Sequence, residues 1–140
     1  MIVPAEGEFR LEGEAATARL GAAVAAELKP GDVVCLSGPL GAGKSTLARG
    51  LIRSLTTANE EVPSPTFTLV QFYDGATPVA HFDLYRLTSP DEAFELGLDE
   101  ALEDGAAVIE WPERLPRPFD EVVTVRIEPR GDTGRTIEIS

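Results

Sequence analysis

Eight residues, from Gly38 to Ser45, constrain this chain more than any other stretch of it. They read Gly-Pro-Leu-Gly-Ala-Gly-Lys-Ser, which is the spacing of the phosphate-binding P-loop. Gly38, Gly41 and Gly43 lack a Cβ, so the backbone can adopt positive φ angles and bring its N–H groups against phosphate oxygens. Lys44 can reach the outer phosphates, the Ser45 hydroxyl can bind Mg²⁺, and the start of the following helix favours negative charge. The stretch therefore predicts a nucleoside triphosphate site that uses Mg²⁺.

The flanks of this loop have the pattern that a P-loop requires. Residues 33–36 form a short apolar run typical of a buried strand, and residues 46–55 place Leu47, Leu51 and Leu55 on one face of a helix. Strand, glycine-rich loop and helix together favour a P-loop over an ordinary glycine-rich turn before Lys-Ser. The sequence has no Asn/Thr-Lys-x-Asp guanine signature, so ATP is favoured over GTP.

Size and hydrophobic patterning predict a single domain over residues 1–140. A chain of 140 residues with 43% apolar content suits one three-layer core. The two last strands alternate as half-exposed strands do, and the turn between them predicts an antiparallel hairpin at the edge of the sheet. Besides those beside the P-loop, we expect strands at 9–11, 67–73, 79–83, 106–110, 121–128 and 135–139, and helices at 14–28 and, in two short pieces, between 89 and 102.

Charge and composition exclude several classes of protein. The net charge of −12 repels phosphate backbones, which disfavours direct nucleic-acid binding as the main role. The single cysteine, Cys35, excludes an internal disulfide, and its place in an expected core strand predicts a buried thiol. No run of 18 apolar residues is present, and residues 1–10 lack the pattern of a secretory signal. We therefore expect a cytoplasmic protein with no membrane segment.

Two of the expected strands end in acids that could serve the nucleotide. The strand at 79–83 ends in Asp83, a Walker-B-type position for a carboxylate that holds Mg²⁺ or its water, and the strand at 106–110 ends in Glu110. His81, the only histidine, is more often a core strand residue than a catalytic base, and we interpret it so. The Ser-Pro-Thr segment at 64–66 fits either a γ-phosphate-sensing switch or a rigid connector.

With these pieces assembled, the chain resembles the TsaE (YjeE) family, small bacterial P-loop ATPases needed for threonylcarbamoyladenosine (t6A) in tRNA. The P-loop itself is generic, but the order of the other motifs is specific to this family. The matching segments are Gly-Pro-Leu-Gly-Ala-Gly-Lys-Ser-Thr at 38–46, Val-Pro-Ser-Pro-Thr-Phe-Thr-Leu-Val at 62–70, His-Phe-Asp-Leu-Tyr-Arg-Leu at 81–87 and Ile-Glu-Trp-Pro-Glu-Arg at 109–114.

The resemblance implies a three-layer α/β/α P-loop NTPase-like fold with a mixed, mostly parallel sheet. It also implies ATP and Mg²⁺ as cofactors, slow ATPase activity, and partnership with the TsaD and TsaB proteins, which transfer the carbamoyl group to tRNA. This chain would then reach tRNA only indirectly, through that complex.

Site residues follow from the resemblance position by position. Ser45 and Glu110 would bind Mg²⁺, and Asp83 would lie beside the metal and the γ-phosphate. Lys44, Asp83, Glu110 and Thr66 would be catalytic, Ser64 and Thr66 would belong to a switch loop, and Trp111 would lie beside the site. The nucleotide would be bound by Glu14, Gly38, Gly41, Ala42, Gly43, Lys44, Ser45, Thr46, Asp83 and Arg135.

The P-loop departs from the family pattern at two positions. Pro39 stands where the family usually has Asp, which removes an acid near the phosphates and fixes one φ angle. Ser45 stands where the family usually has Thr, which keeps the hydroxyl that binds the metal.

Two other functions remain open at this stage. A small-molecule kinase can carry a similar P-loop, but it needs an acceptor site and an arginine-bearing lid, for which the acidic, alternating region after Glu110 is too short. A non-enzymatic module, whose ATP-bound state rather than turnover controls a partner, would have the same sequence.

Overall fold

A computed structural model of the chain describes residues 7–39, 42–57, 60–63, 65, 68–87, 89, 91–115, 122–131 and 134–139, with the side chains of residues 8 and 93 excepted. Three expected site residues, Gly41, Ser64 and Thr66, lie outside these ranges. The elements in chain order are β1 (Gly7–Glu12), α1 (Gly13–Ala25), β2 (Val33–Ser37), α2 (Lys44–Leu55), β3 (Val70–Tyr73), β4 (Val79–Asp83), α3 (Glu92–Glu95), α4 (Leu98–Asp104), β5 (Ala106–Glu110), the 3-10 helix η1 (Pro112–Arg114), β6 (Val123–Arg130) and β7 (Gly134–Ile139).

The strands form one mixed sheet in the order β1-β7-β6-β2-β5-β4-β3. The centre is parallel, because β2 pairs with β5 and β6, and β5 pairs with β4. The pairs β1–β7, β6–β7 and β3–β4 are antiparallel. The expected mixed α/β sheet is confirmed, although parallel pairing covers half of these six pairs rather than most of them.

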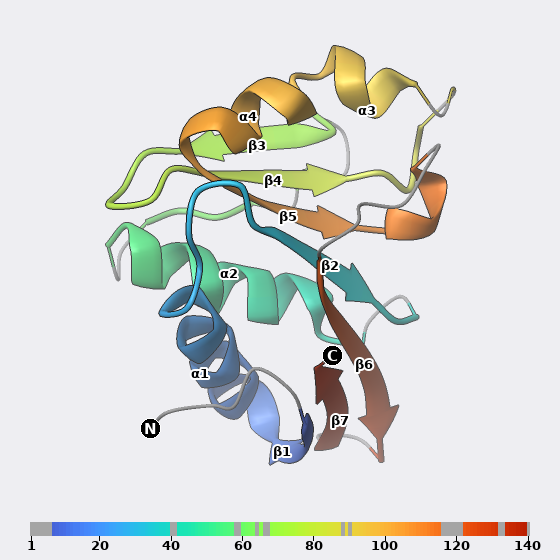
Figure 1. Cartoon of the computed structure of the whole chain (residues 1–140). Coiled ribbons are helices and arrows are strands. Elements are labelled where there is room, and N and C mark those ends of the chain that lie inside the picture. The colour runs from blue at the N-terminus through green and yellow to red at the C-terminus, as the bar shows by residue number, and fades with distance from the viewer. Residues whose placement is uncertain are drawn as a thin grey trace.

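Helices cover both faces of the sheet (Figure 1), as a three-layer fold requires. Alternate residues of the central strand β2 show why. Val34 and Leu36 pack on the face that carries α1 and α2, whereas Val33 and Cys35 pack on the face that carries α3 and α4. A strand buried on both faces appears in sequence as a continuous apolar run, which is the pattern of residues 33–36.

Two glycines let α1 and α2 touch through their backbones. A Cβ built on Gly21 of α1 would lie 2.2 Å from the Leu47 carbonyl oxygen, and one built on Gly50 of α2 would lie 2.2 Å from the Ala18 carbonyl oxygen. Both distances are far below van der Waals contact, so no larger residue fits at either position without a shift of the helices. This close crossing fixes α1 against the helix that follows the P-loop.

The C-terminal hairpin exists, but its expected place at the edge of the sheet is wrong. Strand β6 pairs with the central strand β2, and β7 is covered on its other side by β1. The register from Gly7 opposite Ile139 to Glu12 opposite Gly134 shows that the N-terminal strand closes this side of the sheet. The described edges are therefore β1 and β3.

Smaller differences concern the ends of elements. Helix α1 ends at Ala25, three residues before the expected end at Leu28. Strand β3 begins at Val70 rather than at residue 67, because Leu69 has a φ of 68°, which interrupts an extended strand.

Within the described ranges, no helix is both long and apolar enough to cross a lipid bilayer.

Candidate nucleotide-binding site

The two strand-end acids lie at one edge of the parallel part of the sheet. Asp83 at the end of β4 is directly opposite Glu110 at the end of β5, and Glu110 is in turn opposite Leu36 of β2, two residues before Gly38. Since parallel strands end at the same edge, the P-loop and both carboxylates emerge together. The register therefore places both strand-end acids beside the strand that leads into the P-loop.

The described part of the P-loop depends on glycine at two positions. Gly38 has a φ of 149°, and a Cβ there would lie 2.4 Å from the Ile127 carbonyl oxygen. Gly43 has a φ of 109° and is the N-cap of α2, with no side-chain cap hydrogen bond. Its backbone can therefore point toward a ligand, and the first N–H groups of α2 at Lys44, Ser45 and Thr46 are placed to meet an anion.

Lys44 is a buried cation held inside the site. Its side chain is only 5% exposed, and its Nζ donates a hydrogen bond of 2.8 Å to the Gly38 carbonyl oxygen. The same Nζ lies 3.6 Å from the centroid of the Trp111 ring, a cation–π contact. Burial lowers the pKa of Lys44, and the negative charges of Glu110, Asp83 and Glu113 oppose that shift. A bound polyphosphate would bring further negative charge close to this ammonium and would favour its protonated form.

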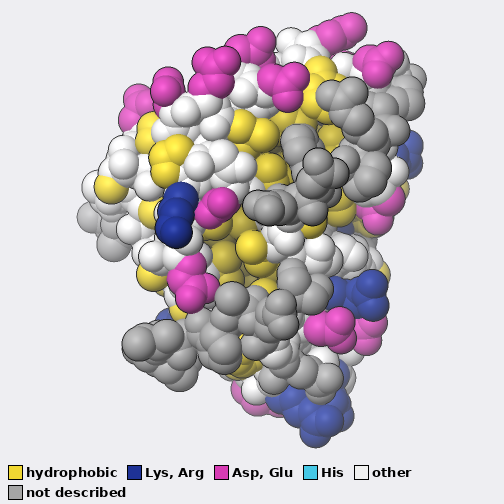
Figure 2. All heavy atoms as spheres, in the orientation of Figure 1, with side chains coloured by type: hydrophobic (Ala, Val, Ile, Leu, Met, Phe, Trp, Pro, Cys, Tyr) yellow, Lys and Arg dark blue, Asp and Glu magenta, His cyan; other side chains and the backbone are white. Residues whose placement is uncertain are grey.

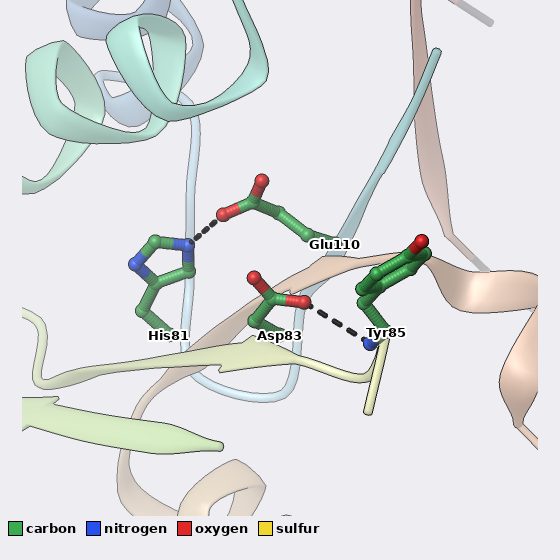
Figure 3. A network of polar contacts seen from close by, with 4 residues as sticks. All are labelled: His81, Asp83, Tyr85 and Glu110. Atoms are coloured by element: carbon green, nitrogen blue, oxygen red, sulfur yellow. Dashed lines mark hydrogen bonds and ion pairs between the residues drawn. The ribbon is translucent and has the colours of Figure 1, made fainter. Parts of the chain in front are cut away.

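The carboxylates are buried and hydrogen-bonded (Figure 3). Asp83 is 5% exposed, and its Oδ1 accepts a hydrogen bond of 3.1 Å from the backbone N–H of Tyr85. Glu110 is 3% exposed, and its Oε2 lies 2.7 Å from His81 Nε2. Side chains at 81 and 83 share one face of β4, because successive residues of a strand alternate.

These groups fit a magnesium ion that is held partly by a nucleotide. Among the described residues, no group of three or more His, Cys, Asp or Glu side chains could hold a metal by itself. Mg²⁺ is usually held by one or two carboxylates together with phosphate oxygens and waters. The hydroxyl of Ser45 and the carboxylate of Glu110, with Asp83 nearby, are hard oxygen ligands of that kind.

Trp111 has a strained backbone beside the P-loop lysine. Its φ of 62° and ψ of 53° are in the left-handed region, which non-glycine residues adopt at a cost of roughly 1–3 kcal/mol. Its ring also packs against Tyr85, with centroids 4.9 Å apart and planes tilted by 41°. The Trp111 ring therefore lies against the P-loop lysine, and its place beside a nucleotide stays a prediction.

Glu14 and Arg135, both expected to bind the nucleotide, line different pockets. The Arg135 side chain lies beside the P-loop, since its Nε would be 3.4 Å from a Cβ built on Gly43. It also lines a pocket of about 260 Å³ with Arg10 and Arg130. Glu14 is exposed and lines a pocket of about 270 Å³ between α1 and α2, together with Thr46 and Arg49.

Comparison with known proteins is consistent with this geometry. The sequence model of a family described as threonylcarbamoyl adenosine biosynthesis protein TsaE matches residues 11–137. The chain belongs to the TsaE family. A protein from Treponema pallidum named tRNA threonylcarbamoyladenosine biosynthesis protein TsaE is 40% identical over 126 residues, which cover 89% of this chain and 93% of the relative.

One more relative and one solved structure of the TsaE family match this chain over different shares of their length. A Rickettsia conorii protein of the same name is 44% identical over 104 residues, 74% of this chain, and that match spans only 59% of the relative's length. The crystal structure of YdiB from Bacillus subtilis superposes with a TM-score of 0.75 at 32% identity, covering 99% of this chain and 86% of that one. The α/β fold is therefore that of a TsaE family structure.

The structure also identifies site neighbours that the sequence did not. His81 was interpreted as a core strand residue, and it is buried, but it is bonded to Glu110. Tyr85 supplies both a backbone donor to Asp83 and an aromatic contact to Trp111. Both belong to the His-Phe-Asp-Leu-Tyr-Arg motif that carries the TsaE resemblance, so the motif was the available signal.

Proposed function

We propose that this chain binds ATP with Mg²⁺ and hydrolyses it slowly. The observation that carries the proposal is the buried ammonium of Lys44, which lies between a P-loop carbonyl and an indole ring and faces two strand-end carboxylates, Asp83 and Glu110. A buried cation beside two buried acids is costly unless the site serves charged ligands.

Each of these residues would have a separate role in phosphoryl transfer to water. That reaction needs charge neutralisation and an aligned water more than covalent chemistry. Lys44, with the first N–H groups of α2, would bind the outer phosphates, and Ser45 with Glu110 would hold Mg²⁺, which supplies further neutralisation of the phosphate charge. Asp83 would lie beside the metal, and Thr66 would contribute from the switch segment.

Slow turnover in the isolated chain follows from how Lys44 is held. Its hydrogen bond to Gly38 and its contact with Trp111 must be exchanged for contacts with phosphate when a nucleotide binds. We therefore expect turnover to rise when a partner completes the site.

The biological role that we propose is formation of t6A at adenosine 37 of tRNAs that read ANN codons, through the TsaD–TsaB transferase complex. It is supported by membership in the TsaE family and by the names of the relatives. Indirect contact with tRNA is supported by charge. The segment from residue 91 to residue 104 carries seven acids and no lysine or arginine, and acidic side chains gather at that end of the molecule (Figure 2).

The same structure makes a kinase a weaker alternative. Strands β6 and β7 are both paired within the sheet, so this part of the chain does not supply the lid that a small-molecule kinase needs. An ATP-gated module that works without turnover differs from an ATPase only in whether hydrolysis is required.

The test measures ATP turnover by the chain alone and with TsaD and TsaB, and t6A formation with ATP or with a non-hydrolysable analogue. We expect weak turnover alone, faster turnover in the complex, and repeated rounds of t6A formation only with ATP. Fast hydrolysis by the isolated chain would contradict the proposed dependence on partners. Full t6A output with the analogue would favour the gated module.

A further inference from the structure

We propose that His81 is a positioning residue that holds the carboxylate of Glu110 in place for the metal. The inference rests on the proposed function, because Mg²⁺ is the ion that Glu110 would bind there. It adds a role for the one histidine of the chain, which does not itself contact the nucleotide or the metal in this account.

The contact spans two neighbouring parallel strands. His81 lies opposite Val108 in the register of β4 and β5, and Glu110 lies opposite Asp83, so the bond runs diagonally across one face of the sheet. His81 Nε2 and Glu110 Oε2 are 2.7 Å apart, and both residues are almost fully buried. Figure 3 shows the imidazole pointing at the Glu110 carboxylate, with Asp83 beside the pair.

The other ring nitrogen indicates which atom carries the proton. His81 Nδ1 is buried and has no hydrogen-bond partner among the described residues. An orphaned buried N–H is rarer than an orphaned acceptor, so the bare lone pair belongs on Nδ1 and the proton on Nε2. Nε2–H then donates to Oε2, and the second carboxylate oxygen is not engaged by His81.

A fixed carboxylate matters because a glutamate side chain is long and has several rotamers. Partners that orient a metal ligand typically change metal affinity by about 10- to 100-fold when they are removed. His81 is placed to act in this way, since it comes from the middle of β4, between the buried residues Ala80 and Phe82, rather than from a loop.

Two substitutions separate the hydrogen bond from packing. In His81→Gln, the amide nitrogen can take the place of Nε2 as donor, whereas His81→Leu has similar bulk and no donor. The measurement is the binding of a non-hydrolysable ATP analogue by calorimetry over a series of Mg²⁺ concentrations. We expect His81→Leu to weaken apparent Mg²⁺ affinity by about 10- to 100-fold, with analogue binding in EDTA unchanged and with most of the loss recovered in His81→Gln.

Equal Mg²⁺ affinity in wild type and His81→Leu would overturn the proposal, as would a His81→Gln variant as weak as His81→Leu. Absence of any Mg²⁺ effect in the wild type would instead count against the proposed function. A second test needs no variant and no metal, because ¹⁵N NMR of the single histidine reports which ring nitrogen is protonated. We expect a protonated Nε2; a neutral ring protonated only at Nδ1 could not donate to Glu110 and would overturn the inference.

Discussion

Replacement of Gly50 by alanine tests the close crossing of α1 and α2 that positions the P-loop helix. Gly50 lies inside α2, where intrinsic propensity alone makes alanine more favourable than glycine by about 0.8–1 kcal/mol. Packing acts in the opposite direction. The new Cβ would lie 2.2 Å from the Ala18 carbonyl oxygen and 2.7 Å from both the Ala18 carbonyl carbon and Cα.

The distances decide which effect is larger. All three atoms belong to the backbone of α1, so the clash cannot be relieved by a change of rotamer. The helices must separate by about 1 Å to bring the 2.2 Å contact to an ordinary distance. Overpacking of this kind typically costs about 1–3 kcal/mol. Because three backbone atoms lie closer than 3.0 Å, we take the upper part of that range, about 2–3 kcal/mol. After a propensity gain of about 1 kcal/mol, we expect a net destabilisation of about 1–2 kcal/mol, which for a chain of this size lowers Tm by roughly 3–8 °C.

The assay is thermal and urea unfolding of Gly50→Ala beside Ser54→Ala, an exposed position of the same helix. The serine variant receives a propensity gain without the clash, so its Tm should rise slightly. Gly21→Ala should also destabilise the protein, because its Cβ would lie 2.2 Å from the Leu47 carbonyl oxygen of α2. The double variant should lose less stability than the sum of the two single losses, since one outward shift of α1 relieves both clashes. A Gly50→Ala protein as stable as Ser54→Ala would refute the crossing.

Three further predictions concern single side chains. Lys44→Ala should abolish detectable ATP binding in calorimetry, whereas the exposed Lys29→Ala should bind as wild type does; retained binding in Lys44→Ala would remove this residue from the site. Burial, with the nearby charge of Glu113, raises the pKa of Cys35 to about 11, so a thiol reagent at pH 8 should label it in the unfolded chain far faster than in the folded one. Rapid labelling of the folded protein would contradict the burial. Because the thiol of the unfolded chain loses its proton at lower pH than that of the folded chain, the free energy of unfolding should also fall as the pH rises above about 9. Tyr73→Phe removes a buried hydroxyl that has no partner among the described residues, so unfolding should show unchanged or slightly higher stability, and a loss above about 1 kcal/mol would reveal a hydrogen bond.

The parts of the fold that could be predicted from sequence are those with strong local signals. The apolar runs at 79–83 and 106–110 match β4 and β5 residue for residue, because strands buried on both faces need apolar side chains along nearly their whole length. The P-loop was clear because glycine at 38 and 43 is required by backbone angles that other residues rarely adopt.

The parts that could not be predicted depend on which strands become neighbours. The alternation of apolar and polar residues at 135–139 predicted a half-buried strand. Nothing in the sequence of that segment indicates that β1 pairs with its other edge. The same limit applies to His81. Its strand was correct, but its bond to Glu110 exists only because β4 and β5 are adjacent and in one register.

The central claim is that Ser45 and the strand-end acids Asp83 and Glu110 meet at one metal and one triphosphate. The most direct measurement is a crystal structure with a non-hydrolysable ATP analogue and Mn²⁺ in place of Mg²⁺, with the ion located by its anomalous signal. We predict a peak roughly 2.1–2.2 Å from the Ser45 hydroxyl oxygen, between the outer phosphates and the two carboxylates. A nucleotide and metal bound on another face of the molecule, away from these residues, would contradict the account.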